Sequence, residues 1–546
     1  MKQKNIPRRQ RAEDMVDKQC QRALAQMDAG NYADALKRLE SLLERAPEHY
    51  LARLNRSVCL SQLGRHDEAA RQLYSVHVSV PNDLRVLKMC GVAHATAGYF
   101  DMAIRFLQRY TKEKPSDYDA WTAMCTCAGG LGQYTNAVMY ATQALGLDPL
   151  NPDAYNNLGV TLLALARLDE AEQAFQTALA IDAENITASS NIGAVYEKRG
   201  DFEGAVISYD SVLPRIDQNS PFGKEFLYRS SYAYLGAGLL SEGWRRYDYG
   251  FFPQDSLSRQ PKRKFVVPRW TGEELTEDRL LVWGEQGLGD ELWFLGILNE
   301  VRERCSNVTV ECEPRLVSLL QRSFPDVSVR ASNLSPSASC DYDFHIPAGS
   351  LMGIFRNQIS DFKKFKPYLK PHAARSKDFL ETLKPYAEKK LIGVCWRSGK
   401  LSAQRNQYFL SLDELSEVLT NPNYAIVNLQ YGDCEEELLR VEDALGIEII
   451  RWQDLDLKDD QEGVAALISQ LDLVLSAPTA VAQLAIAMGS PLIQFGLRHW
   501  SFLGQERYPW SSNMTWITPE DGQPLNTALP KIVEAVSNAD KFFDQN

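Results

Sequence analysis

The chain has 546 residues, of which 45% are hydrophobic and 24% are charged, and its formal net charge is −12 at pH 7. A chain of this length exceeds what one hydrophobic core serves, so we expect more than one domain. The acidic balance argues against a general nucleic-acid binder, because surfaces that track phosphates need a basic excess.

No run of about 20 uncharged apolar residues occurs, so the sequence predicts no membrane span. The basic residues near the N-terminus have no apolar segment behind them, which argues against a secretory signal. The ten cysteines include one close pair, Cys125 and Cys127, and show no paired metal-type spacing. We therefore expect reduced, mostly buried thiols and a cytoplasmic protein.

Residues 16–219 consist of six copies of a 34-residue unit that keep one register. Each copy has an alanine at one position and a small residue five positions before it. The alanines are Ala35, Ala69, Ala103, Ala137, Ala171 and Ala205, and the small residues are Gly30, Gly64, Gly98, Gly132, Ala166 and Gly200. The glycine ends one helix, the alanine lets two helices approach closely, and a proline such as Pro47 stops the second helix. This pattern resembles the tetratricopeptide repeat, a stack of helix pairs with a long concave face.

A variant seventh copy follows, with Gly238, Leu240, Gly243 and Tyr247 at the key positions, four residues late. We therefore expect the repeat domain to extend over residues 16–252. The next stretch, residues 253–277, contains three prolines and a basic cluster. Its composition predicts either an ordered strap out of the repeats or a plain linker.

From Asp278 on, short apolar runs alternate with helical periods. The predicted strands are Arg279–Trp283, Val308–Cys312, Tyr342–Ile346, Leu391–Trp396, Ala425–Leu429, Glu448–Ile450, Asp472–Ser476 and Leu492–Phe495. The predicted helices are Glu291–Arg304, Asp413–Leu419, Glu435–Leu445, Val464–Leu471 and Val481–Met488. This alternation is typical of parallel sheets covered on both faces. We expect two Rossmann-like halves, residues 278–370 and 391–540, with a cleft between them.

Four segments carry polar or glycine-bearing loops directly after predicted strands: residues 283–291, 391–400, 428–432 and 476–480. Together with the repeats, they resemble the GT-B glycosyltransferases related to lipopolysaccharide heptosyltransferases, in the form fused behind tetratricopeptide repeats. Within that group the chain most resembles bacterial flagellin glycosyltransferases, and the protein O-linked N-acetylglucosamine transferases share the plan. The resemblance implies an N-terminal all-α solenoid followed by an α/β GT-B domain. Ligands of such folds bind beyond the carboxyl ends of the strands, where all four segments fall.

The resemblance also implies a nucleotide-sugar donor as the only small-molecule partner. The implied donor-binding residues are Gly287, Gly289, Arg397, Ser398, Gly399, Lys400, Arg405, Gln430, Tyr431, Ser476, Thr479 and Ala480. Amides at the start of the helix after Thr479 would hold phosphate, and the basic side chains would add charge. The alternative is that Thr479 merely begins a helix and the basic residues are solvated. The family usually has Asp and His where this chain has Pro478 and Gln483, which weakens any assignment of the donor.

The resemblance assigns the general base to Asp290, because a carboxylate in a cleft can take the proton of an acceptor hydroxyl. Glu291 and Glu285 are rival bases. The alternative for Asp290 is an ordinary N-cap of the helix that follows Gly289.

Two Asp-x-Asp pairs, at 341–343 and 454–456, formally match metal-dependent glycosyltransferases. The first lies in a predicted strand and the second in an acidic loop, where such pairs are more often solvated. GT-B relatives usually need no metal, so we predict none.

The concave face of the repeats offers a surface for a protein partner. Asn55, Asn157 and Asn191 share one position of the unit, and they resemble the asparagine ladder that holds an extended peptide by its backbone. The alternative is plain polar surface, and apolar Val58 and Val92 also suggest a mixed groove for an amphipathic helix.

The sequence thus predicts a protein O-glycosyltransferase that modifies Ser or Thr of an acceptor held by the repeats. By resemblance, the acceptor is flagellin and the donor is a CMP-activated nonulosonic acid such as pseudaminic or legionaminic acid. The alternatives are a non-catalytic adaptor with a degenerate glycosyltransferase domain and a lipopolysaccharide glycosyltransferase.

Overall fold

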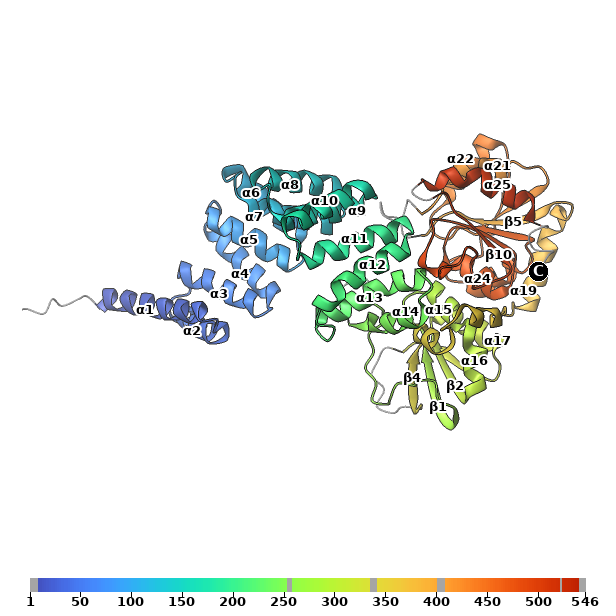
Figure 1. Cartoon of the computed structure of the whole chain (residues 1–546), viewed down its shortest axis with the longest axis horizontal. Coiled ribbons are helices and arrows are strands. Elements are labelled where there is room, and N and C mark those ends of the chain that lie inside the picture. The colour runs from blue at the N-terminus through green and yellow to red at the C-terminus, as the bar shows by residue number, and fades with distance from the viewer. Residues whose placement is uncertain (1–7, 253–257, 334–340, 400–407, 521–522, 540–546) are drawn as a thin grey trace, which may run out of the picture. The chain divides into compact units, whose positions relative to one another are not determined.

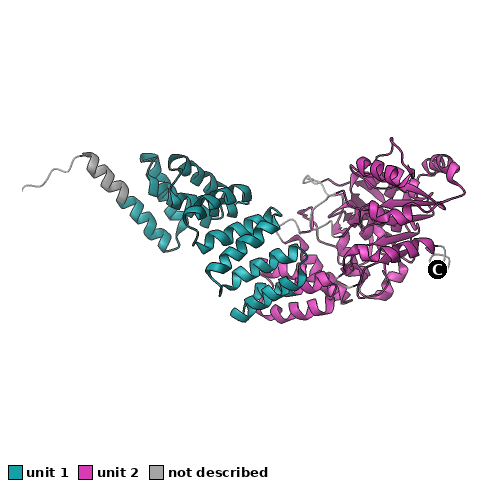
Figure 2. Cartoon of the chain, turned by 90° about the horizontal axis from the view of Figure 1, so that it is seen from above, with its two compact units in different colours: residues 1–192 teal, residues 193–546 magenta. Residues whose placement is uncertain are grey.

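The structure is a computed structural model that describes residues 8–252, 258–333, 341–399, 408–520 and 523–539, with the backbone alone for residues 8–17. It divides into two compact units, unit 1 with residues 1–192 and unit 2 with residues 193–546 (Figure 2). The division falls inside helix α11 (Ile186–Arg199). The last helices of the repeat array therefore belong to the same unit as the α/β part.

Unit 1 is a series of helix pairs in which sequential helices pack against each other (Figure 1). Its helices before α11 are α1 (Arg8–Asp28), α2 (Tyr32–Arg45), α3 (Tyr50–Gln62), α4 (His66–Ser79), α5 (Leu84–Thr96), α6 (Phe100–Glu113), α7 (Tyr118–Gly130), α8 (Tyr134–Leu147), α9 (Pro152–Ala164) and α10 (Leu168–Ile181). The recurring alanines of the repeat are all at most 1% exposed, as the close approach of paired helices requires.

The turn inside each helix pair explains the recurring glycine. Gly30, Gly64, Gly98 and Gly132 have φ between 71° and 81°, in the left-handed region that glycine adopts without steric cost. Ala166 occupies the same turn with φ 59° and is thus a strained exception. The local pattern alone therefore sets where these helices end.

Unit 2 begins with the end of α11 and continues with α12 (Phe202–Val212), α13 (Pro221–Gly236) and α14 (Leu240–Tyr247). The α13–α14 pair is the predicted variant copy, and Gly238 between them has φ 79°. The two helices bury Tyr228, Trp244 and Tyr247 in the same hydrophobic core as the first parallel sheet.

Two parallel sheets follow. The first has the order β3-β2-β1-β4, formed by β1 (Leu275–Trp283), β2 (Cys305–Cys312), β3 (Ser328–Ala331) and β4 (Phe344–Pro347). The second has the order β10-β9-β8-β5-β6-β7, formed by β5 (Lys390–Cys395), β6 (Tyr424–Asn428), β7 (Ile449–Ile450), β8 (Leu473–Ser476), β9 (Leu492–Phe495) and β10 (Met514–Ile517). The prediction of a helical-repeat array followed by parallel α/β architecture is confirmed, and the GT-B assignment stays a prediction.

Helices cover the sheets as the apolar strands require. They are α15 (Leu288–Phe294), α16 (Leu298–Arg304), α17 (Val317–Ser323), α18 (Met352–Phe355), α19 (Ala373–Leu383), α21 (Ser416–Leu419), α22 (Glu435–Leu445), α23 (Gln461–Ile468), α24 (Ala480–Met488) and α25 (Leu529–Ser537). In the second sheet, Val394 packs in one core with α21, α22 and α25, whereas its neighbour Cys395 packs in another with α23 and α24. Adjacent strand residues face opposite sides, so both faces are covered.

Some elements differ from the predictions. Strands β3 and β10 were missed because both lie at a sheet edge and are largely half-exposed, which removes the continuous apolar signal. Helices α17, α19 and α25 were also missed. Within the region predicted as strap or linker, the described residues pack against the α/β part: Trp270 is buried, and its backbone N–H donates to His345 O at 2.9 Å. Strand β1 begins inside it, at Leu275.

Candidate functional site

A cavity of about 840 Å³ in unit 2 is lined by loops and helix starts from both parallel sheets. Many of the residues that the sequence singled out line this cavity together: Gly287, Gly289, Asp290, Ser398, Gly399, Tyr431, Thr479 and Ala480. They follow β1, β5, β6 and β8 in the chain. The carboxyl ends of strands in both sheets thus open on one space, as the parallel topology favours.

Asp290 is the carboxylate of the predicted set that lines the cavity. It is the third residue of α15, whose N-cap is Gly287 rather than Asp290. The backbone N–H of Gly287 donates to its carboxylate, which resembles half of a capping box. Burial raises the pKa of Asp290 to about 6, and the nearby Glu285 charge adds to the shift. The carboxylate is therefore ionised at neutral pH but holds its proton more tightly than an exposed aspartate.

The two rival bases do not line the cavity. Glu291 is buried, and its Oε2 accepts a hydrogen bond from Glu313 N at 2.7 Å. Burial raises the pKa of Glu291 to about 8. Glu285 is buried in an ion pair with Arg259. Of the three carboxylates, the geometry favours Asp290 as a proton acceptor for a bound molecule.

Helix α24 presents its N-terminus to the cavity. Thr479 is its N-cap, in extended conformation with no side-chain cap bond, and Pro478, Ala480 and Val481 line the cavity beside it. The first N–H groups of a helix have no partner within the helix and carry partial positive charge. This end of α24 therefore suits an anionic group such as a phosphate.

Ser476 and Gln430 are buried and lie behind the cavity wall rather than in it. Ser476 Oγ donates to Ala477 O at 2.7 Å. Gln430 Oε1 accepts hydrogen bonds from Trp396 N at 3.1 Å and Arg397 N at 2.9 Å. Both side chains hold the loops that follow β5, β6 and β8, so the structure gives them a supporting place instead of direct donor contact.

Arg397 also lies outside the lining, contrary to the expected phosphate contact. Its guanidinium pairs with Glu437 of α22 and donates to Asp433 O at 2.9 Å. The Glu437 hydrogen bonds raise the pKa of Arg397. Because the charge is already paired, Arg397 anchors the loop after β5. Lys400 and Arg405 lie outside the described residues.

The basic side chains of the described lining are those of Lys458 and of Arg315, which is itself paired with Glu313 and Asp459. The sequence predicted neither residue for the site. Arg315 Nε donates to Glu313 Oε1 at 3.0 Å, and its Nη1 donates to Lys458 O at 2.9 Å. Neither residue follows a glycine-bearing motif, so no sequence signal marked them. Their positions depend on β2 and on the loop before α23 meeting in space.

Several further lining residues are aromatic or amide side chains that sequence analysis did not select as site residues: Trp293, Gln461, Gln494, His499, Tyr508 and Trp516. Gln483, which stands where the family usually has a histidine, lines the cavity too. Among the described groups, Gln483 Oε1, both amide atoms of Gln494 and Trp293 Nε1 are buried without a hydrogen-bond partner. Gln494 interrupts the apolar strand β9, and a buried amide in such a strand is the signal that could have found it.

The two Asp-x-Asp pairs have other partners. Asp343 pairs with Arg279 at 3.0 Å, and Asp341 pairs with Arg330. Asp456 Oδ1 accepts from the N–H groups of Lys458 and Asp459 in a turn. Across the part of the chain that the structure describes, no group of three or more His, Cys, Asp or Glu side chains could hold a metal ion.

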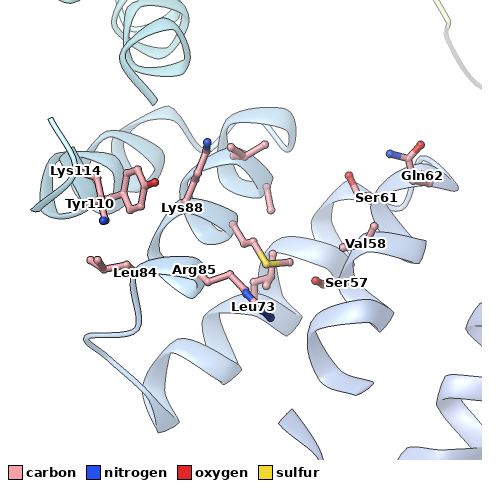
Figure 3. A pocket seen from close by; sticks show the side chains of 13 residues that line it. Ser57, Val58, Ser61, Gln62, Leu73, Leu84, Arg85, Lys88, Tyr110 and Lys114 are labelled. Atoms are coloured by element: carbon pink, nitrogen blue, oxygen red, sulfur yellow. The ribbon is translucent and has the colours of Figure 1, made fainter. Parts of the chain in front are cut away.

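A second cavity, of about 490 Å³, lies in unit 1 between helices α3 to α6 (Figure 3). Apolar side chains including Val58, Val92 and Met89 line it, and basic Arg85 and Lys114 stand beside them. Lys88, also in the lining, is paired with Asp117 at 2.8 Å. Val58 and Val92 thus share one groove, as the mixed-groove prediction requires.

The three asparagines lie half-buried on α3, α9 and α11, the first helices of their copies. Asn191 Nδ2 donates to Asn156 Oδ1 at 2.8 Å, and Asn55 Nδ2 approaches Cys20 Sγ at 4.0 Å. Two of the three amides therefore make contacts between neighbouring copies. Their expected peptide contact stays a prediction.

Models of the tetratricopeptide-repeat family match residues 20–84 and residues 130–187. Protein FlbA of Caulobacter vibrioides is 29% identical over 541 residues, which cover 94% of this chain and 89% of that protein. Heat shock protein STI1 of Saccharomyces cerevisiae is 29% identical over 110 residues, 20% of this chain and 19% of that protein.

Solved structures resemble parts of the chain. A tetratricopeptide repeat protein from Parabacteroides merdae covers 43% of this chain and 91% of its own length, with 13% identity and a TM-score of 0.39. MamA from Desulfovibrio magneticus covers 32% of this chain and 97% of its own length, with 17% identity and a TM-score of 0.30. Among the described helices, none is both long and apolar enough to cross a bilayer. The family matches confirm the predicted repeat type, and the chain contains tetratricopeptide repeats.

Proposed function

We propose that this chain is a protein O-glycosyltransferase, which transfers a sugar from a nucleotide donor to Ser or Thr of an acceptor protein. One observation carries the proposal: a carboxylate, Asp290, and a helix N-terminus, that of α24, open on the same cavity from the two parallel sheets. Sugar transfer needs both groups, a proton acceptor for the incoming hydroxyl and a fixed positive field for the departing phosphate.

In the proposed reaction, the acceptor hydroxyl oxygen forms a bond to the anomeric carbon and its proton passes to Asp290. The bond between that carbon and the donor phosphate breaks, and its electron pair leaves with the nucleotide. A carboxylate with a pKa near 6 is ionised at neutral pH and is a stronger base than an exposed aspartate. The amides of α24 would stabilise the charge that develops on the phosphate.

The rest of the cavity suits a sugar nucleotide. Gln483, Gln494 and Trp293 offer unpartnered donors and acceptors, which match hydroxyl and amide groups. Aromatic side chains, Tyr508 and Trp516 among them, offer flat apolar surface beside these polar groups. Lys458 supplies positive charge in the part of the lining that the structure describes, whereas Arg315 is paired with Glu313 and Asp459.

The repeats would hold the acceptor, because tetratricopeptide arrays present concave surfaces to protein partners. The groove of unit 1, with Val58 and Val92 in its wall, fits the apolar face of an amphipathic segment. The resemblance to flagellin glycosyltransferases points to flagellin as the acceptor and to a CMP-activated nonulosonic acid as the donor. That this chain and Protein FlbA are similar over nearly their whole lengths supports one function for the repeats and the α/β part together.

The experiment combines the purified chain, flagellin of the same organism made in a heterologous host, and CMP-, UDP- and GDP-activated sugars. Intact mass spectrometry should show flagellin gaining the mass of one sugar type per modified site, with one donor class. A complete lack of mass gain with every donor, while flagellin from the native cells is modified, would contradict the proposal.

The adaptor alternative is favoured by one observation. Arg397, the basic residue expected to face the donor, is paired with Glu437 instead. An adaptor would bind flagellin but no nucleotide. Calorimetric titration with CMP, UDP, GDP and ADP separates the two functions, because the transferase must bind at least one of them.

A further inference from the structure

We propose that the buried ion pair between Arg259 and Glu285 positions the loop that leads into α15, and with it Asp290, so that the segment after the repeat array sets the reactivity of the site. This inference rests on the proposed function, in which Asp290 is the proton acceptor. Arg259 and Glu285 are positioning residues, since neither lines the cavity.

The pair joins three parts of unit 2. Arg259 follows α14 in the chain, and its Nε donates to Glu285 Oε2 at 2.6 Å while its Nη2 donates to Glu285 Oε1. Glu285 Oε1 also accepts from Gly349 N at 2.8 Å, just after β4. Arg259 Nη2 donates to Ser350 Oγ at 3.0 Å as well. Both charged side chains are completely or almost completely buried, so the bidentate pair is held in one geometry.

The same loop is held at a second place. Gln286 has φ 66°, a conformation that side chains disfavour. Its backbone N–H donates to Gln260 O at 2.5 Å, and its Nε2 donates to Tyr247 Oη. Arg259 and Gln260, in the segment that follows the repeats, and Tyr247 of α14 thus hold Glu285 and Gln286. A strained residue persists only where its surroundings fix it, and here Asp290 follows four residues later.

The charges near Asp290 come from these same elements. Glu285 is the group whose charge acts on Asp290, and the Asp290 charge in turn raises the pKa values of Glu291, Tyr228, Tyr232 and Tyr247. The negative charge of Glu285 contributes to the raised pKa of Asp290, and Arg259 partly offsets that charge by pairing with Glu285. The ion pair therefore acts on Asp290 in two ways: it fixes the conformation of the loop before α15, and it sets the electric field at the Asp290 carboxylate.

The test uses the full chain with Glu285→Gln and with the double variant Arg259→Met/Glu285→Gln, which leaves no unpaired buried charge. The matched control is Arg356→Met/Glu300→Gln, which removes another buried ion pair of unit 2. Two quantities are measured: the acid limb of the pH–rate profile, and the titration of Asp290 by carboxyl ¹³C NMR, assigned with Asp290→Asn.

We expect Glu285→Gln to lower the Asp290 midpoint by about one pH unit, because it removes a negative charge and frees a positive one. The double variant should lower it by a smaller amount. In both, kcat should fall by about tenfold while the KM for the donor stays within about twofold, since the N-terminus of α24, which would hold the donor phosphate, is not disturbed. The control should change only thermal stability.

A midpoint and a kcat that stay at their wild-type values in folded Glu285→Gln and in the double variant would overturn the proposal and leave the pair a purely structural contact. The NMR titration reports on the loop without any turnover. If the Asp290 midpoint shifts as expected in Glu285→Gln while the wild-type chain transfers no sugar to any acceptor, the positioning role is supported and the transferase is refuted.

Discussion

The regular repeats of unit 1 and the last helix pair of unit 2, α13–α14, are built on the same pattern but bury different side chains. The regular copies close on small residues, so that Ala103 and its equivalents let helices touch. The last pair has Gly243 at that position and buries Trp244 and Tyr247 beside it. Trp244 Nε1 donates at 2.9 Å to the backbone oxygen of Arg356, which lies 112 residues later in the chain.

An aromatic cluster explains this difference. The ring of Trp500 lies 5.4 Å from Tyr232 of α13, 6.1 Å from Trp244 of α14 and 5.2 Å from Trp293 of α15. Trp293 in turn lines the cavity. A repeat that ends an array has one face with no next copy to cover it, and here the α/β part covers that face. One sequence pattern thus builds helix pairs that close on small residues in unit 1 and a helix pair that packs against the candidate site in unit 2.

The largest expected effect comes from removing the proton acceptor in unit 2. Asp290→Asn keeps the size of the side chain and can still bond to the backbone, but it cannot take a proton. The transfer rate should fall by about 10²–10⁴-fold, while acceptor binding by the repeats persists. Rates are measured by intact mass of flagellin over time, with Asp413→Asn, an exposed partner of Arg440, as control. Normal turnover by Asp290→Asn would remove it as the base.

The second prediction compares equivalent positions of the two kinds of repeat. Trp244→Ala should destabilise unit 2 by about 3–5 kcal/mol and reduce nucleotide binding, because a large buried ring is lost from the aromatic cluster that supports Trp293. Ile104→Ala, at the same position of a regular copy, should cost about 2–4 kcal/mol and leave nucleotide binding intact. Calorimetric unfolding and nucleotide titration measure both. Equal loss of nucleotide binding in the two variants would show that the last helix pair supports the candidate site no more than a regular repeat does.

The third prediction uses the pKa of Glu291, which is near 8 in the folded chain and near 4.3 when unfolded. Between these values the folded state binds the proton more tightly, so the free energy of unfolding falls as pH rises from about 4.5 to about 8. Glu291→Gln should remove this part of the pH dependence. Melting temperatures of the two chains should agree near pH 4.5 and diverge in favour of the variant near pH 8. Parallel curves over that range would contradict burial of an ionisable Glu291.

The smallest effect concerns the turn of a regular repeat. Ala166→Gly removes the strain of φ 59° but adds freedom to the unfolded chain, so unit 1 should gain at most about 1 kcal/mol. Gly132→Ala, the reverse change in the preceding copy, should destabilise by a similar amount. Urea unfolding followed by circular dichroism measures both. A loss of stability in Ala166→Gly would show that the strain is relieved by contacts of the alanine methyl group.

Much of the α/β part was predictable where strands are central and apolar. Strand β9 and helix α22 have the predicted bounds, because a continuous apolar run and an amphipathic period are local signals. Edge strands β3 and β10 were not predictable, since half-exposed residues carry no such signal. The Gly287–Asp290 and Pro478–Ala480 segments meet as expected because both follow parallel strands.

The remaining site residues could not be predicted in the same way. The partner of Arg397 is Glu437, 40 residues later, and no motif links the two. Arg315 and Lys458 lie in different halves of the α/β part and come together through a hydrogen bond to a backbone carbonyl. Such pairings depend on which helix ends beside which loop, and that follows from the packing of whole sheets.

The sequence by itself determined the repeat type, the positions where its helices begin and end, and the parallel α/β class. These follow from local physics: the φ that glycine allows, the close approach that alanine allows, and the period of apolar residues. Only the tertiary structure decided that the last helix pair joins unit 2, that Arg397 is paired, and that Asp290 is the carboxylate in the cavity with a raised pKa. Burial and the nearby charges decide those properties, and both come from residues far apart in the chain.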